Sequence, residues 1–167
     1  ALVYRDDGKC LLGRSAKFRP GMYTCISGFV DACETVEDAV RREVFEESGV
    51  VVDDVQLLTS QPWPIGRSGS CELMLACVAR AKTTEIEVDT AEMEDIRWFS
   101  RDEVLDAYDN AVRYANHGSH PPDPTTLWIP GSYAIAHHLV KHWLDSPAPQ
   151  VTPFAVSHHE APSLGVR

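Results

Sequence analysis

Residues 28–50 read GFVDACETVEDAVRREVFEESGV, and this stretch decides the fold. It predicts a helix over residues 35–48, because Thr35 can cap the helix and Asp38 suits a capping box. Gly49 suits the left-handed position after the last turn. Apolar side chains recur at helical spacing as a stripe that can be buried: Val36, Ala39, Val40 and Val44. We therefore expect a loop followed by an amphipathic helix.

Three glutamates crowd one face near the end of this helix. Glu43 and Glu47 are four residues apart, and Glu46 is three residues from Glu43, so their carboxylates are neighbours. Each like-charged pair costs roughly 0.2–0.5 kcal/mol on an isolated helix, and the negative end of the helix dipole adds roughly 0.3–1 kcal/mol per charge. Either Arg41 and Arg42 compensate as ordinary surface ion pairs, or a hard divalent cation binds there, since Mg²⁺ prefers oxygen ligands.

The remaining segments predict a mixture of strands and helices. Asp7-Gly8 between two apolar runs predicts a hairpin over residues 1–12. Other strands are expected at residues 23–30, 50–59, 72–81 and 96–99, and other helices at 101–108 and 132–144, with an irregular insertion at 115–126. We interpret residues 1–145 as one α+β domain, an α/β/α sandwich, and residues 146–167 as a flexible tail in which no periodicity is visible.

Composition narrows the class of protein. The formal net charge of -10 opposes non-specific binding to nucleic acid, which depends on many Lys and Arg side chains. The five cysteines are scattered without a C-x-x-C pair, so neither a structural zinc site nor a disulfide framework is expected. We expect an intracellular protein, by default cytoplasmic, with the peroxisome or another organelle as the alternative. No run of 18 apolar residues occurs, so no membrane attachment is expected. Because the chain opens inside an expected strand, we expect it to be a piece of a longer protein.

Residues 28–50 match a known motif at every specified position. The motif is the Nudix box, G-x5-E-x7-R-E-U-x-E-E-x-G-U with U an aliphatic residue, and the chain therefore resembles Nudix hydrolases. The resemblance implies a Nudix-type sandwich with a central mixed sheet and Mg²⁺- or Mn²⁺-dependent attack of water on a pyrophosphate. Cys33 stands where the family usually has glycine, at a position that the motif leaves free. That change removes no metal ligand.

The same resemblance implies roles for individual residues. Glu43, Glu46 and Glu47 are implied as metal ligands, joined by Glu92, which matches a late acidic ligand. Glu34 is implied to pair with Arg42 and so to hold the loop. The implied catalytic residues are therefore Glu34, Arg42, Glu46 and Glu47. Glu46 is our choice of general base, and Glu92 is the alternative.

A second motif indicates the substrate. Residues 60–68 read SQPWPIGRS and resemble the S-Q-P-W-P-F-P-x-S array of NADH pyrophosphatases, with Ile65-Gly66 in place of Phe-Pro. The resemblance implies substrate binding by four residues: Phe29, Gln61, Trp63 and Ala136. The implied reaction converts NADH or NAD⁺ to NMNH or NMN and AMP, and extends to removal of NAD caps from RNA. It also implies a homodimer.

Two other functions remain open on the sequence. One is a Nudix hydrolase of ADP-ribose, diadenosine polyphosphates or CoA-type substrates, in which the metal chemistry would be the same. The other is a catalytically silent Nudix module that binds a nucleotide or a protein. The complete set of glutamates argues against the silent module.

Overall fold

The computed structural model describes residues 1–64, 66 and 69–146 as five strands, three α-helices and a short 3₁₀ helix. The strands are β1 (Leu2–Tyr4), β2 (Cys10–Arg14), β3 (Val52–Trp63), β4 (Glu72–Ala81) and β5 (Asp95–Phe99). The helices are α1 (Val36–Ser48), α2 (Arg101–Arg113), η2 (Ala115–His117) and α3 (Ile135–Asp145). Within these residues, no helix combines the length and apolar character that crossing a membrane requires.

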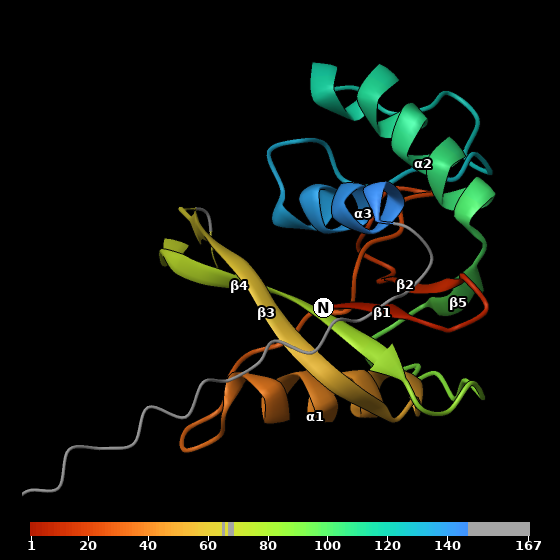
Figure 1. The fold of residues 1–167 in the computed structure, drawn as a ribbon. Coiled ribbons are helices and arrows are strands. Elements are labelled where there is room, and N and C mark those ends of the chain that lie inside the picture. The colour runs from red at the N-terminus through yellow and green to blue at the C-terminus, as the bar shows by residue number, and fades with distance from the viewer. Residues whose placement is uncertain (65, 67–68, 147–167) are drawn as a thin grey trace, which may run out of the picture.

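The strands form one mixed sheet in the order β3-β4-β1-β2-β5. β1 runs parallel to β4, and the other neighbouring pairs are antiparallel. Helix α1 covers one face of the sheet and α2 and α3 cover the other (Figure 1), which confirms the predicted three-layer architecture. One apolar core lies on each side of the sheet. The core on the α1 side contains Val44 and Ile26, and the core on the other side contains Leu139 and Trp143.

The N-cap and C-cap predicted for α1 are present, but the Asp38 carboxylate accepts from the Thr35 hydroxyl at 2.9 Å instead of completing a capping box. The hydroxyl of Thr35 accepts a hydrogen bond from the backbone N–H of Asp38 at 3.1 Å, and Gly49 adopts the left-handed conformation with φ of 70°. Val44 is fully buried and Ala39 nearly so, so the apolar stripe faces the sheet. Local chemistry therefore fixes where the helix begins and ends.

The strand predicted over residues 23–30 is wrong. Thr24 makes an isolated bridge to Gly13, and Met22, just before the segment, makes another to Trp128. The first half of residues 23–30 is buried between the β2 edge and the segment before α3, and the second half is an exposed loop. The buried apolar residues produced a strand-like pattern, but each neighbouring segment offers a single bridge rather than a ladder.

Other boundaries also differ from the prediction. β3 continues to Trp63, α2 continues to Arg113, and α3 begins at Ile135 instead of residue 132. The antiparallel hairpin of β1 and β2 is confirmed by the Val3–Leu11 pairing. The predicted tail lies outside the described residues, apart from Ser146.

Candidate active site

Arg42 is the centre of a hydrogen-bonded network in front of α1. Its guanidinium donates two hydrogen bonds to the carboxylate of Glu34, at 2.6 and 3.2 Å. It donates further bonds to Glu43 at 2.8 Å, to Glu46 at 3.1 Å and to the carbonyl oxygen of Phe29 at 2.9 Å. The hydrogen bonds from Arg42 lower the pKa of Glu34, and the carboxylates, Glu34 foremost, raise the pKa of Arg42. One planar cation thus ties the loop to the helix.

Gly28 brings the loop into direct contact with Glu43. A Cβ atom built on Gly28 would lie 1.8 Å from Cδ of Glu43 and 2.1 Å from each of its carboxylate oxygens. Any side chain at position 28 would therefore displace this carboxylate. The glycine of the motif is required here for close packing, not for an unusual backbone angle.

Glu47 is the most unusual carboxylate of the group. Glu47 is only 6% exposed, and its buried Oε2 has no hydrogen-bond partner within residues 1–64, 66 and 69–146. Burial, followed by the charges of Glu43, Glu92 and Asp89, raises its pKa from 4.5 to about 7. A buried anion among other anions is unstable unless a cation or a proton compensates it.

The connection from β4 to β5 closes the site behind α1. Backbone N–H groups of Glu87 and Asp89 donate to the carbonyl oxygens of Ser48 and Glu47, at 2.8 and 3.0 Å. Glu92 follows Asp89 within a tight turn, so its carboxylate belongs to the electrostatic surroundings of Glu47. Sequence reasoning identified Glu92 but missed Asp89. The Asp-Thr-Ala stretch at residues 89–91 is a turn signal that could have indicated it.

These carboxylates are hard oxygen donors of the kind that a divalent cation requires. No group of three or more His, Cys, Asp or Glu side chains within residues 1–64, 66 and 69–146 already converges as a set of metal ligands. Arg42 binds the carboxylates of Glu43 and Glu46, at 2.8 and 3.1 Å. The buried, unpartnered oxygen of Glu47 is the kind of hard donor that Mg²⁺ or Mn²⁺ uses.

Gln61 and Trp63 meet the segment that leads into α3. The side-chain amide of Gln61 donates to the carbonyl oxygen of Tyr133 at 2.9 Å, and the rings of Trp63 and Tyr133 stack at 6.5 Å between centroids. Ala136 lies three residues further on, in the first turn of α3. The structure thus brings Gln61 and Trp63 together and adds Tyr133, for which the sequence carried no signal.

Phe29 is separate from both apolar cores. Its side chain is 49% exposed, although it follows the buried residue Ile26 by only three positions. The carbonyl oxygen of Phe29 accepts a hydrogen bond from Arg42 at 2.9 Å, so this half-exposed ring lies next to the Arg42 network.

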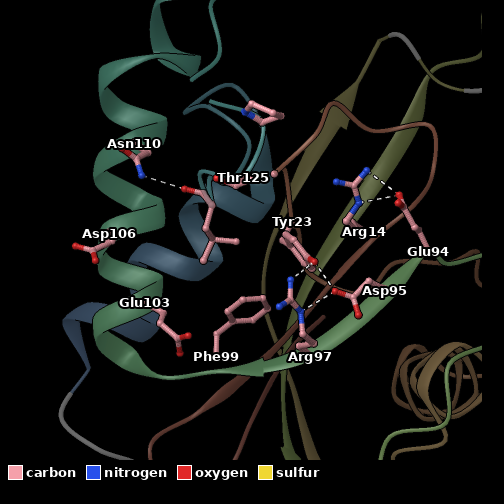
Figure 2. Close-up of a pocket in the computed structure, with 13 residues that line it drawn as sticks. Arg14, Tyr23, Glu94, Asp95, Arg97, Phe99, Glu103, Asp106, Asn110 and Thr125 are labelled. Carbon is pink, nitrogen blue, oxygen red and sulfur yellow. Dashed lines mark hydrogen bonds and ion pairs between the residues drawn. The ribbon is translucent and has the colours of Figure 1, made fainter. Parts of the chain in front are cut away.

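A pocket of about 740 Å³ lies beside β5 and α2 (Figure 2). In it, the hydroxyl of Tyr23 is hydrogen-bonded to Asp95 and Arg97, and Arg14 forms an ion pair with Glu94 at 2.7 Å. None of the site residues predicted from the sequence lines this pocket. The predicted site residues lie instead around α1, β3, the start of α3 and the turn that carries Glu92.

The amino-acid sequence of the chain is similar to those of known proteins. Residues 1–117 match the NUDIX domain. The chain is 48% identical over 143 residues to the human protein named NAD-capped RNA hydrolase NUDT12, covering 86% of this chain and 28% of that protein. It is 42% identical over 150 residues to human NAD(P)H pyrophosphatase NUDT13, mitochondrial, covering 87% of this chain and 40% of that protein. The chain thus spans between about a quarter and two fifths of the length of these relatives.

The fold agrees with a solved structure. A hydrolase of the NUDIX family from Clostridium perfringens superposes with a TM-score of 0.57 at 14% identity, over 86% of this chain and 92% of that one. At that identity the similarity supports the fold alone. The family match covers well over half of the chain and includes the Arg42 network and the acidic helix α1. The chain therefore belongs to the NUDIX domain family.

Proposed function

We propose that this chain hydrolyses the pyrophosphate bond of NADH and NAD⁺, giving NMNH or NMN and AMP, and that it removes NAD caps from RNA 5′ ends. The observation that carries the proposal is the acidic end of α1, where Glu47 is buried with an unpartnered oxygen beside other carboxylates. Such an arrangement is costly unless it binds a cation. Relatives named for hydrolysis of NAD-capped RNA and NAD(P)H supply the substrate class.

We assign Mg²⁺ or Mn²⁺ to four carboxylates: Glu43, Glu46, Glu47 and Glu92. A divalent ion bound there would polarise the phosphoryl oxygens and lower the pKa of a bound water. The chain itself supplies the support. Arg42 fixes the loop through Glu34, and the absence of a side chain at Gly28 lets Glu43 approach.

Glu46 is the proposed general base. It is more exposed than Glu43, with 56% of its side chain accessible against 18%, so it can reach a water in front of the helix. Its Oε2 accepts a hydrogen bond from Arg42 at 3.1 Å, which orients the carboxylate and leaves the other oxygen available to take a proton. Glu92 is the alternative base, and the separate variants Glu46→Gln and Glu92→Gln distinguish the two.

Aromatic side chains are proposed to bind the two ends of the dinucleotide. Phe29 is exposed next to the Arg42 network, and stacking of a base on an aromatic ring contributes about 1–3 kcal/mol. The second group is Gln61 and Trp63 with Ala136, held against Tyr133 at the entry to α3. The amide of Gln61 is held in place by its hydrogen bond to Tyr133 at 2.9 Å.

We also propose that the chain acts as a homodimer. β3 is an edge strand of the sheet, and large apolar side chains are exposed along β3 and β4. Leu57 is 52% and Leu73 is 64% exposed. An exposed edge with apolar side chains is a surface that a second strand or a second copy can cover.

The proposal is tested by comparing substrates with one preparation. NADH, NAD⁺, ADP-ribose, diadenosine tetraphosphate and NAD-capped RNA are supplied with Mn²⁺, and products are separated by chromatography. We expect NMNH or NMN and AMP from the nicotinamide dinucleotides, no turnover with EDTA, and loss of turnover in Glu47→Gln. Equal or better turnover of ADP-ribose would assign the chain to another Nudix activity. No turnover of any substrate would favour a binding module.

A further inference from the structure

Glu92 lies in a turn that is anchored to α1. The N–H of Asp89 donates to the carbonyl oxygen of Glu47 at 3.0 Å, and the N–H of Glu87 donates to that of Ser48 at 2.8 Å. The last carbonyl groups of a helix have no partner inside the helix, so these two donors complete the end of α1. They also fix the start of the turn to the residue that carries the buried carboxylate.

Asp89 closes the turn with its own side chain. Its Oδ1 accepts a hydrogen bond from the N–H of Ala91 at 2.9 Å. Its carbonyl oxygen accepts from the N–H groups of Glu92 and Met93, at 3.2 and 2.9 Å. This combination is an Asx turn followed by a tight backbone turn. The backbone of Glu92 is therefore bonded directly to Asp89.

The other end of the turn is anchored in the core. Met93 is only 8% exposed and belongs to the core between α1 and the sheet. The N–H of Glu94 donates to the carbonyl oxygen of Arg14 at 2.9 Å, and the Arg14 guanidinium pairs with the Glu94 carboxylate (Figure 2). Glu92 thus projects from a short segment whose two ends are both held.

We propose that Asp89 is a positioning residue for the metal site, and that its turn holds Glu92 beside Glu47. This inference rests on the proposed function, because it assumes that Glu47 and Glu92 share a cation. The backbone supports their proximity, because the N–H of Asp89 is bonded to the carbonyl oxygen of Glu47 at 3.0 Å and the N–H of Glu92 is bonded to that of Asp89 at 3.2 Å. Asp89 acts through the turn, since one of its side-chain oxygens is already bonded to the backbone of Ala91.

Two substitutions separate the turn from the charge. Asp89→Asn removes the charge but keeps a side-chain oxygen at the same distance from the backbone, so the turn can form. Asp89→Glu keeps the charge, but the additional methylene group prevents the same closed turn. A matched control is Asp123→Glu, because Asp123 forms the same turn with Thr125 and Thr126, at 2.8 and 3.1 Å, in the loop before α3.

Mn²⁺ binding is measured in the absence of substrate, from the electron paramagnetic resonance signal of the Mn²⁺ that stays free. Outer-shell residues typically contribute 10–100-fold to metal affinity, so we expect Asp89→Glu to weaken Mn²⁺ binding by about tenfold. Asp89→Asn should stay within about threefold of the parent, and Asp123→Glu should equal the parent. The KM for NADH is measured alongside, and its dependence on Mn²⁺ concentration should shift in Asp89→Glu alone.

Three results would overturn the inference. Parent-like Mn²⁺ binding by Asp89→Glu would show that the turn is not needed, and equal weakening in Asp89→Asn would show that the charge matters instead. Weakening in Asp123→Glu would point to a general loss of stability. The Glu47→Gln variant distinguishes failure of the inference about Asp89 from failure of the proposed function. If Glu47→Gln binds Mn²⁺ as the parent does, the metal site itself is wrongly assigned.

Discussion

Replacing Glu47 by glutamine is expected to stabilise the metal-free protein at alkaline pH while abolishing hydrolysis. Glu47 has a folded-state pKa of about 7 against an ordinary value of 4.5. The unfolded chain therefore loses this proton at lower pH than the folded chain does. Below about pH 4.5 Glu47 is protonated in both states, and the free energy of unfolding carries no penalty from its charge. The penalty grows as the pH rises and reaches its full size above about pH 7. Glutamine imitates the protonated side chain at every pH.

The size of the effect follows from the same values. A pKa of about 7 against 4.5 corresponds to roughly 3 kcal/mol at about 1.4 kcal/mol per pH unit. At pH 5.5 the charge on Glu47 lowers the free energy of unfolding by about 1.4 kcal/mol. The gain in stability from glutamine should therefore be about 2 kcal/mol larger at pH 8.5 than at pH 5.5. Movement of Glu43 and Glu92 would reduce the difference to about 1 kcal/mol, which is still roughly 2–4 °C in Tm for a domain of this size.

The assay is calorimetric unfolding in EDTA at pH 5.5 and pH 8.5. Glu46→Gln is the matched control, because it removes a carboxylate from the same turn of α1 at a position whose side chain is 56% exposed. Exposed ion pairs contribute roughly 0–1 kcal/mol, so this control should change little between the two pH values. A Glu47→Gln protein that is less stable than the parent at pH 8.5 would refute the reasoning.

Three further changes test other parts of the site. Arg42→Lys should lower kcat/KM for NADH by about 10–100-fold, because lysine cannot repeat the paired hydrogen bonds to Glu34. Steady-state kinetics measures this loss, and an unchanged kcat/KM would contradict the role of the network. Trp63→Ala, which loses the stack on Tyr133, should raise the KM for NADH several-fold at unchanged Mn²⁺ affinity, and a change in metal affinity alone would contradict it. Leu73→Lys, at a 64% exposed site, should convert a dimer to a monomer in light scattering, and a parent that is already monomeric would refute the dimer.

Local chemistry explains the parts of the fold that the sequence predicts well. Thr35 and Gly49 fix the ends of α1 by hydrogen bonding and by backbone conformation, and both signals are contained in a few residues. The capping box of Ser100 and Glu103 at the start of α2 is of the same kind. The ion pair of Arg42 with Glu34, implied by the motif, is present at 2.6 Å.

Tertiary contacts explain what the sequence does not predict. The strand predicted over residues 50–59 extends through Pro62 to Trp63, because an edge strand tolerates a residue without an N–H on its open side. α2 continues through Asn110, whose side chain donates to the carbonyl oxygen of Leu127 at 3.0 Å. The contact of Tyr133 with Trp63 joins residues that are 70 positions apart. The sequence around Trp63 and the sequence around Tyr133 contain no local signal for this contact.

The metal and the Glu47→Gln substitution should stabilise the protein through the same interaction, so their effects should not add. A ligand at 100 times its Kd stabilises the folded state by about 2.7 kcal/mol, close to the roughly 3 kcal/mol estimated for the charge on Glu47. In the parent, Mn²⁺ at pH 8.5 should therefore raise Tm about as much as glutamine does. In Glu47→Gln, the same Mn²⁺ concentration should have little effect, because the unpartnered carboxylate oxygen is gone. Equal Mn²⁺-dependent shifts in the two proteins would show that the cation binds elsewhere, and that the raised pKa of Glu47 has a purely structural origin.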